Sequence, residues 1–172
     1  MIKFEKVSLG QFMKDCRTLE SSGSLWFSGD DEIEKIYEQI QLPRRGTMRS
    51  AGYDFYMPFP ASFVSGNPVM IPTGIRALIN EGTFLMCVPR SGLGFKYGMR
   101  LKNSLGVIDS DYKFAENEGH IMAKIDTDLP FKLAGGDRFM QGIIIPYFIT
   151  DDDDPIQRER TGGFGSTGGT GE

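Results

Sequence analysis

Side chains that can bind an anionic ligand follow a predicted strand near the middle of the chain. The apolar run 83–88 stops at Pro89 and is followed by Arg90, Ser91 and Gly92. A guanidinium fork, a hydroxyl and a backbone amide beside a glycine are donors that suit phosphate oxygens. The stretch lacks the spacing of a P-loop, and taken alone it is more typical of an ordinary polar turn.

A second stretch places a carboxylate at the end of another predicted strand. Asp109 follows the apolar residues Val107 and Ile108. Partial burial at a strand end could keep the Asp109 carboxylate oriented toward a water molecule, as a general base requires. Tyr112 brings a flat ring that suits the face of a sugar. A strand followed by an Asp-rich turn is the alternative explanation.

Two further polar positions, and the only histidine, say less when each is taken alone. Asp54 lies just inside a predicted strand, and Gln141 offers an oriented amide side chain near the start of the last strand. His120 has no Cys or His near it in sequence, so the sequence predicts no zinc site. Any metal would be a hard cation such as Mg²⁺, brought in with phosphate oxygens.

The composition limits the classes of protein to consider. With 172 residues, 40% of them hydrophobic and 24% charged, the chain fits one soluble globular domain. The net charge of −4 gives no basic surface for a polynucleotide. No apolar run has the roughly 20 residues of a membrane helix, and the N-terminus lacks the layout of a signal peptide. Cys16 and Cys87 are predicted to be buried thiols rather than a disulfide, so we expect a cytoplasmic protein.

The first forty residues have helical rather than strand periodicity. Ser8 and Gln11 have the spacing of a capping box, and apolar residues follow at helical intervals. Asp31 with Glu34 predicts the start of a second helix. We expect residues 9–40 to form a small helical segment packed on the main domain; a docking surface for a partner is the alternative.

From Pro43 onward, short apolar runs are separated by Gly, Pro, Asn and Asp. The predicted strands are residues 52–58, 69–72, 75–79, 83–88 and 142–149. Because no helical pattern separates them, they favour an all-β sandwich, barrel or jelly roll over an alternating α/β sheet. We expect one β domain over residues 1–150 and a flexible, glycine-rich arm over residues 151–172. The arm contains G-x-G-x-x-G at 163–168, but without the strand before it and the helix after it that a dinucleotide-binding turn needs.

Taken together and in order, these stretches resemble the five motifs of the trimeric deoxyuridine triphosphate diphosphatase (dUTPase) family. The resemblance covers roughly residues 42–168. The ordered set is far more specific than any single motif. The matching stretches are Ala51-Gly52-Tyr53-Asp54, Pro89-Arg90-Ser91-Gly92-Leu93, Asn103 with Gly106-Val107-Ile108-Asp109-Ser110-Asp111-Tyr112, Gly136-Asp137-Arg138 with Gln141, and Gly162-Gly163-Phe164-Gly165-Ser166-Thr167-Gly168.

The resemblance implies a jelly-roll homotrimer that hydrolyses dUTP to dUMP and pyrophosphate with Mg²⁺, in active sites shared between subunits. Asp109 matches the general base that activates water for attack on the α-phosphorus. Asp54 matches a carboxylate that supports the metal indirectly, through water, while the substrate phosphates hold most of the Mg²⁺ shell. The matched contacts to the phosphates are Arg90, Ser91, Gly92 and Gln141.

Residues for specificity and for the tail are implied in the same way. Asn103 and the backbone at Val107 and Ile108 match the hairpin that reads uracil, and the strand of Met122 helps. Tyr112 matches the ring that packs on deoxyribose. In the tail, Phe164 matches a ring that stacks on uracil. The matched contacts to the terminal phosphate are Arg160, Gly165, Ser166 and Thr167.

Three departures accompany the resemblance. Arg160 stands four residues before Phe164, where the family usually has its arginine five before. The link at residues 113–118 is longer than usual, so a loop is expected near the active site, and residues 9–40 have no counterpart in short family members. Two other functions stay open from the sequence: a dCTP deaminase of the same fold, and a regulatory or binding protein built on the dUTPase fold.

Overall fold

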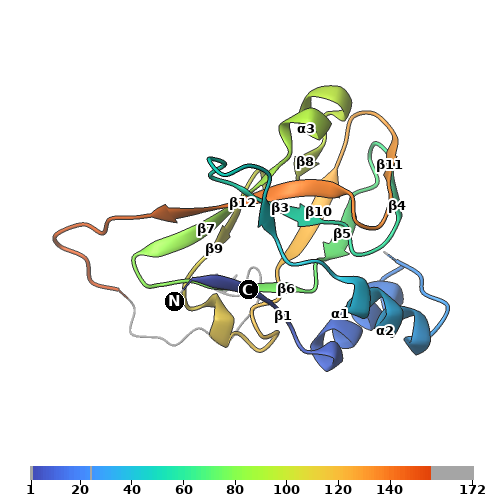
Figure 1. The fold of residues 1–172 in the computed structure, drawn as a ribbon, viewed down its shortest axis with the longest axis horizontal. Helices are drawn as coiled ribbons and strands as arrows, with labels where there is room; N and C mark the ends of the chain where they lie inside the picture. The colour runs from blue at the N-terminus through green and yellow to red at the C-terminus, as the bar shows by residue number, and fades with distance from the viewer. Residues whose placement is uncertain (1, 24, 156–172) are drawn as a thin grey trace, which may run out of the picture.

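The computed structural model describes residues 2–23 and 25–155, and this part of the chain is mostly β with three α-helices (Figure 1). The α-helices are α1 (Leu9–Ser21), α2 (Asp30–Gln39) and α3 (Ser91–Tyr97), and η1 (Tyr112–Phe114) is a short 3₁₀ helix. The strands are β1 (Lys3–Lys6), β2 (Arg44–Arg45), β3 (Tyr53–Tyr56), β4 (Ala61–Phe63), β5 (Val69–Pro72), β6 (Ile75–Leu78), β7 (Thr83–Pro89), β8 (Arg100–Leu101), β9 (Gly106–Ile108), β10 (Met122–Asp126), β11 (Phe131–Leu133) and β12 (Arg138–Pro146).

The strands pair antiparallel, and the largest sheet has the order β2-β3-β12-β7-β9. In this sheet Gln141 of β12 lies opposite Asp54 of β3 on one side and Val88 of β7 on the other. The smaller sheets are β5-β10-β8, β1-β6 and β11-β4. The four internal strands expected between residues 52 and 88 are therefore confirmed, whereas the last strand begins earlier than expected, at Arg138.

Both helices expected in the first forty residues are present, and in Figure 1 they lie together at one end of the molecule. Ser8 caps α1 as expected, because its Oγ accepts a hydrogen bond from the Gln11 amide at 3.1 Å. The expected start of α2 is wrong. The helix begins at Asp30 behind Gly29, without a side-chain cap, and the acidic residues of its first turn instead interact favourably with the positive end of the helix dipole.

The two helices and the strands share one hydrophobic core. Phe12 and Ile33 from the helices belong to the same cluster of buried side chains as Phe55 from β3. Cys16 and Cys87 are free and buried, and burial raises the pKa of both thiols to about 12. The prediction of buried thiols is confirmed. Among the described residues, no helix has the length and apolar content needed to cross a membrane.

The helix α3 was not expected from the sequence. It begins directly after Arg90, where the sequence suggests only a polar turn, and it contains two glycines, which are poor helix formers. The helix ends at Gly98, whose φ of 66° is readily adopted by glycine. Ser91 and Gly92 therefore lie in the first turn of a short helix that follows β7 directly.

Candidate active site

Three of the residues singled out from separate stretches meet at one buried carboxylate. Asp54 is only 3% exposed. Its Oδ1 accepts a hydrogen bond from Gln141 Nε2 at 3.0 Å and forms an ion pair with Arg90 Nε at 3.3 Å. Its Oδ2 accepts from Arg138 Nη1 at 3.2 Å. We call these four residues the Asp54 cluster. A buried carboxylate with three donors holds the guanidinium groups in fixed positions, which suits the binding of phosphate oxygens.

The strand register of the main sheet explains how the Asp54 cluster forms. Asp54 and Gln141 face each other on β3 and β12, and Arg90 follows β7, the strand on the other side of β12. Arg138 stands three residues before Gln141, a spacing that puts two side chains on opposite faces of a regular strand. The register shifts between Arg138 and Met140, and this irregularity brings Arg138 to the same carboxylate. No sequence pattern indicates such a bulge, which is why Arg138, although part of a matched motif, was given no role at the site.

Ser91 and Gly92 lie beside the Asp54 cluster in sequence and are exposed. Gly92 has nothing within 4 Å of where a Cβ would stand. A ligand can therefore approach the backbone at this point closely. The position fits the expected phosphate contacts, and Arg90 reaches from the same segment back to Asp54 with its side chain 31% exposed.

The residues expected to read a uracil ring also come together. Asn103, Ile108 and Met122 line one small cavity of about 10 Å³, with Cys87 and Gly106 in its wall. That volume is on the order of one water molecule, which is too small for a pyrimidine in this conformation. The expected hairpin is not a regular one, because β8 pairs with β10 and β9 pairs with β7; only an isolated bridge joins Leu101 to Ser104.

Val107 lies on the other side of its strand from the cavity. Its neighbours Gly106 and Ile108 are buried, whereas the Val107 side chain is 48% exposed. This alternation is the normal consequence of a strand, in which successive side chains point to opposite faces. Any contribution of Val107 to the cavity would come from its backbone, as the resemblance implies.

The turn after β9 differs from the expectation at Asp109. Asp109 is exposed, not partly buried, and lies just beyond Ile108, the last residue of the strand. Tyr112 is 1% exposed and belongs to the hydrophobic core, and its contact with a deoxyribose stays a prediction. The Tyr112 hydroxyl donates to the carbonyl of His120 at 3.0 Å and accepts from Asn117 Nδ2 at 2.8 Å.

Asp109 and the Asp54 cluster lie far apart within the chain. Ile108 pairs with Leu85, near the start of β7, whereas Arg90 follows the end of that strand. Asp54 lies three strands away from β9, about 14 Å at the usual strand spacing, and about 10 Å further along the sheet. The distance from Asp54 to Ile108, the last residue of β9, is therefore about 17 Å, and Asp109 lies one residue further away. The described chain does not bring these two regions to one phosphate group.

No group of three or more His, Cys, Asp or Glu side chains that could hold a metal ion occurs among residues 2–23 and 25–155. Asp54 supplies the carboxylate of its cluster, and both of its oxygens are engaged by the donors described above. Direct coordination by Asp54 would place the cation next to two guanidinium groups, which electrostatic repulsion disfavours. The donor set thus fits a cation that takes most of its oxygen ligands from a phosphate-containing substrate. The tail residues expected to bind substrate, 160 and 164–167, lie outside the described residues.

Comparisons with known proteins identify the family of the chain. A dUTPase family model matches residues 38–168. The deoxyuridine 5′-triphosphate nucleotidohydrolase of Lactococcus lactis subsp. lactis is 41% identical over 133 residues, covering 75% of this chain and 89% of that protein. Its namesake from Arabidopsis thaliana is 34% identical over 154 residues, covering 87% of each. The crystal structure of dUTPase from Streptococcus mutans superposes with a TM-score of 0.59 at 38% identity, covering 66% of this chain and 91% of that one. Because the family model spans most of the sequence, the chain belongs to the dUTPase family.

Proposed function

We propose that the protein hydrolyses dUTP to dUMP and pyrophosphate, with a water molecule activated by Asp109 attacking the α-phosphorus. The observation that carries the proposal is the Asp54 cluster, in which residues from three of the five matched motifs meet. Relatives at 34–41% identity bear the name deoxyuridine 5′-triphosphate nucleotidohydrolase. The reaction would limit the incorporation of uracil into DNA and supply dUMP.

The Asp54 cluster supplies what phosphoryl chemistry mainly needs, which is positioning and neutralisation of charge. Arg90 and Gln141 are held by Asp54, so their free donor atoms face the ligand with little freedom left to lose. Mg²⁺, bound mainly by the substrate phosphates, would add further neutralisation of their negative charge. Ser91 and Gly92 complete the phosphate contacts from the first turn of α3.

The active site is proposed to be shared between the subunits of a homotrimer with the jelly-roll architecture. The separation of about 17 Å between the end of β9 and Asp54 supports sharing, since a base and its phosphate contacts must flank one α-phosphate. A neighbouring copy would bring its Asp54 cluster to the Asp109 of this chain. Exposed apolar side chains such as Phe95 (91%), Phe148 (97%) and Ile149 (70%) are available for contacts between copies.

Selectivity for uracil is assigned to the cavity lined by Asn103, Ile108 and Met122. A site whose buried polar groups fit only one base edge rejects other bases, because a mismatch leaves those groups unpaired. Since the cavity is small in the chain alone, base binding is expected to open it. The tail, with Arg160 and Phe164, is proposed to close over the nucleotide.

The direct test is to incubate the protein with Mg²⁺ and either dUTP or dCTP. We expect dUMP and pyrophosphate from dUTP and no ammonia from dCTP. Ammonia release would favour the deaminase. An assembled protein that leaves both nucleotides unchanged would favour a binding or regulatory role instead.

The shared site has a test of its own, which is complementation between two inactive variants. Asp109→Asn and Arg90→Ala proteins are each expected to be nearly inactive. When they are coexpressed and form mixed trimers, some sites receive an intact Asp109 from one chain and an intact Arg90 from another, so activity should return. A mixture that stays as inactive as its components, although mixed trimers are detected by mass, would place the whole site within one chain.

A further inference from the structure

The helical segment at residues 9–40 is joined through its N-cap to the long link at residues 113–118, which follows the motif of Asp109. Glu118, in this link, accepts two hydrogen bonds from Ser8, the N-cap of α1: from the backbone amide at 2.8 Å and from the hydroxyl at 2.6 Å. In a capping box the first of these bonds would be made by Gln11. Here Gln11 Nε2 donates to Asp15 instead. A carboxylate 110 residues away therefore completes the cap of α1.

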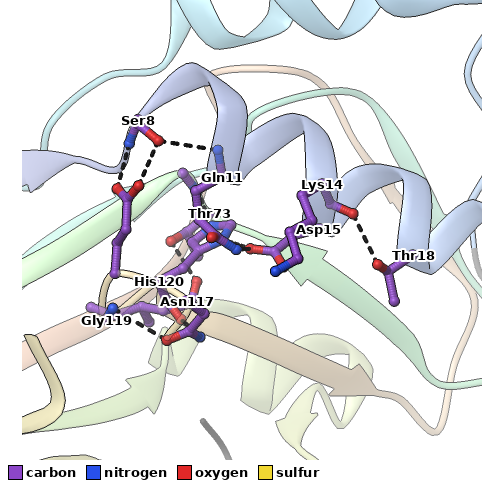
Figure 2. A network of polar contacts seen from close by, with 12 residues as sticks. Ser8, Gln11, Lys14, Asp15, Thr18, Thr73, Asn117, Gly119 and His120 are labelled. Carbon is purple, nitrogen blue, oxygen red and sulfur yellow. Dashed lines mark hydrogen bonds and ion pairs between the residues drawn. The ribbon is translucent and has the colours of Figure 1, made fainter. Parts of the chain in front are cut away.

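A second contact joins α1 to His120, two residues beyond Glu118, about two turns further along the helix (Figure 2). His120 is fully buried, and its Nδ1 lies 2.6 Å from Asp15 Oδ2. Its Nε2 accepts a hydrogen bond from the amide of Gly74 at 2.7 Å. Since Nε2 is an acceptor, Nδ1 carries the ring proton and donates it to Asp15. The imidazole is thus held on both sides.

Residues 117–120, which include Glu118 and His120, also bond directly to Tyr112. The carbonyl of His120 accepts from the Tyr112 hydroxyl, and Asn117 donates to the same hydroxyl at 2.8 Å. Glu118 has a φ of 58°, a strained value for a residue with a side chain, and its contacts with Ser8 offset that cost. Gly119 follows with a φ of 74°, and a Cβ there would lie 2.9 Å from the Tyr112 carbonyl oxygen.

Tyr112 in turn closes the turn that carries Asp109. The Tyr112 amide donates to the Asp109 carbonyl at 3.2 Å. The Tyr112 ring is buried, so it anchors this turn from inside the protein. A continuous series of contacts therefore runs from the helical segment, through the residues 117–120, to the backbone of Asp109.

We propose that the helical segment positions the Asp109 carboxylate for catalysis, through Glu118 and His120 and then through Tyr112. The inference rests on the proposed function, in which Asp109 activates the water. Ser8, Asp15, Asn117, Glu118 and His120 are positioning residues in this scheme. The segment thereby has a catalytic use in addition to covering part of the core, because small displacements of a base lower the rate of the chemical step strongly.

The test compares steady-state kinetics of full-length variants with dUTP. Glu118→Ala removes both bonds to Ser8, and Asn117→Ala removes one bond to the Tyr112 hydroxyl while leaving the α1 cap intact. For each we expect kcat to fall about tenfold and KM to change less than about twofold. Glu118→Gln keeps an acceptor for Ser8 and should restore most of kcat. The matched control is Thr18→Ala, which deletes one hydrogen bond of α1, to the carbonyl of Lys14, away from the loop; its kcat should equal that of the wild type.

A purely structural role predicts a different result, namely lower melting temperatures with an unchanged kcat for the folded protein, and that result would overturn the proposal. Combination with Asp109→Asn sharpens the test. If Glu118 acts through Asp109, the double variant should turn over as slowly as Asp109→Asn alone. An additional tenfold loss in the double variant would contradict the inference. Normal turnover by Asp109→Asn would instead contradict the proposed function, so the two failures are distinguishable.

Discussion

The Asp54 cluster and the Asp109 turn are held in place by different kinds of contact. The Asp54 cluster depends on the backbone register of three neighbouring strands, which places Asp54, Gln141 and the end of β7 side by side. The Asp109 turn lies beyond the last paired residue of an edge strand. It is anchored by side-chain bonds from Tyr112 and from the loop that α1 holds.

The difference predicts how each region responds to substitution. A backbone ladder survives the loss of any one side chain, so changes near the Asp54 cluster should act on the contact removed and on little else. The Asp109 turn depends on a series of side-chain bonds, and the loss of one bond loosens those that follow it. A substitution at Ser8 or Asp15 can therefore displace Asp109. These two residues lie outside residues 38–168, the part of the chain that matches the family model. Substitutions far from the site are therefore expected to affect the Asp109 turn more than the Asp54 cluster.

The largest effect is expected from Asp109→Asn. The amide cannot take the proton of the attacking water, so kcat should fall about 10³-fold while dUTP still binds. Asp151→Asn, which changes an exposed aspartate outside the five matched motifs, is the matched control and should retain most of kcat. Turnover and nucleotide binding are measured separately, by pyrophosphate release and by calorimetry. Near-normal turnover of Asp109→Asn would remove this residue from the role of base.

A smaller loss, about 100-fold in kcat/KM, is expected from Asp54→Ala. The substitution frees Arg90 and Gln141 from their common acceptor, and each must then be ordered by the substrate. The loss should lie mainly in KM, in contrast to the loss in kcat expected at Asp109. Arg138→Gln removes one donor and leaves Arg90 and Gln141 paired with Asp54, so its effect should be much weaker. Equal losses in the two variants would show that the carboxylate does not organise Arg90.

Local patterns predicted the elements of this fold well. The expected strand at residues 69–72 coincides with β5, and the Ser8 cap of α1 is where the capping pattern puts it. Each of these features depends on neighbouring residues alone. The helix α3 was missed because its glycines argue against a helix. Tertiary contacts hold it instead, since Leu93 and Tyr97 pack against the core and the Tyr97 ring stacks on Phe131.

Contacts between distant residues could not be predicted from patterns. Asp54 and Gln141 were each recognisable as candidates, but their meeting depends on a register that no local signal encodes. The contact of Asp15 with His120 spans 105 residues, and without zinc-ligand neighbours the histidine suggested no role. The exposure of Asp109 and the burial of Tyr112 follow from where β9 ends and how residues 113–120 fold back, which are tertiary features.

Gly74→Ala should destabilise the contact between the helical segment and the sheets. Gly74 has a φ of 72°, and a Cβ there would lie 2.2 Å from Ile40 Cδ1. Left-handed strain and overpacking together are expected to cost about 2–3 kcal/mol, lowering the melting temperature by about 5–10 °C. Gly66→Ala is the matched control, since Gly66 has a φ of 78° with open space around it. Equal shifts for the two variants would show that Ile40 simply moves aside.

The smallest effect concerns acid stability and isolates the bond between Glu118 and Ser8. Burial acts to raise the pKa of Glu118, but the hydrogen bonds from the Ser8 hydroxyl and amide outweigh it, with help from Arg76 and His120, and the net pKa is lowered from 4.5. A lowered pKa in the folded state means that the bond contributes stability above pH 4.5 and that this contribution is lost as the pH falls through the folded-state pKa.

At neutral pH, Glu118→Ala should melt about 2–4 °C below the wild type, the equivalent of about 1 kcal/mol. The difference should shrink progressively in melts recorded below pH 4.5. A gap between wild type and Glu118→Ala that stays constant with pH would mean that the carboxylate charge is not what holds the cap of α1.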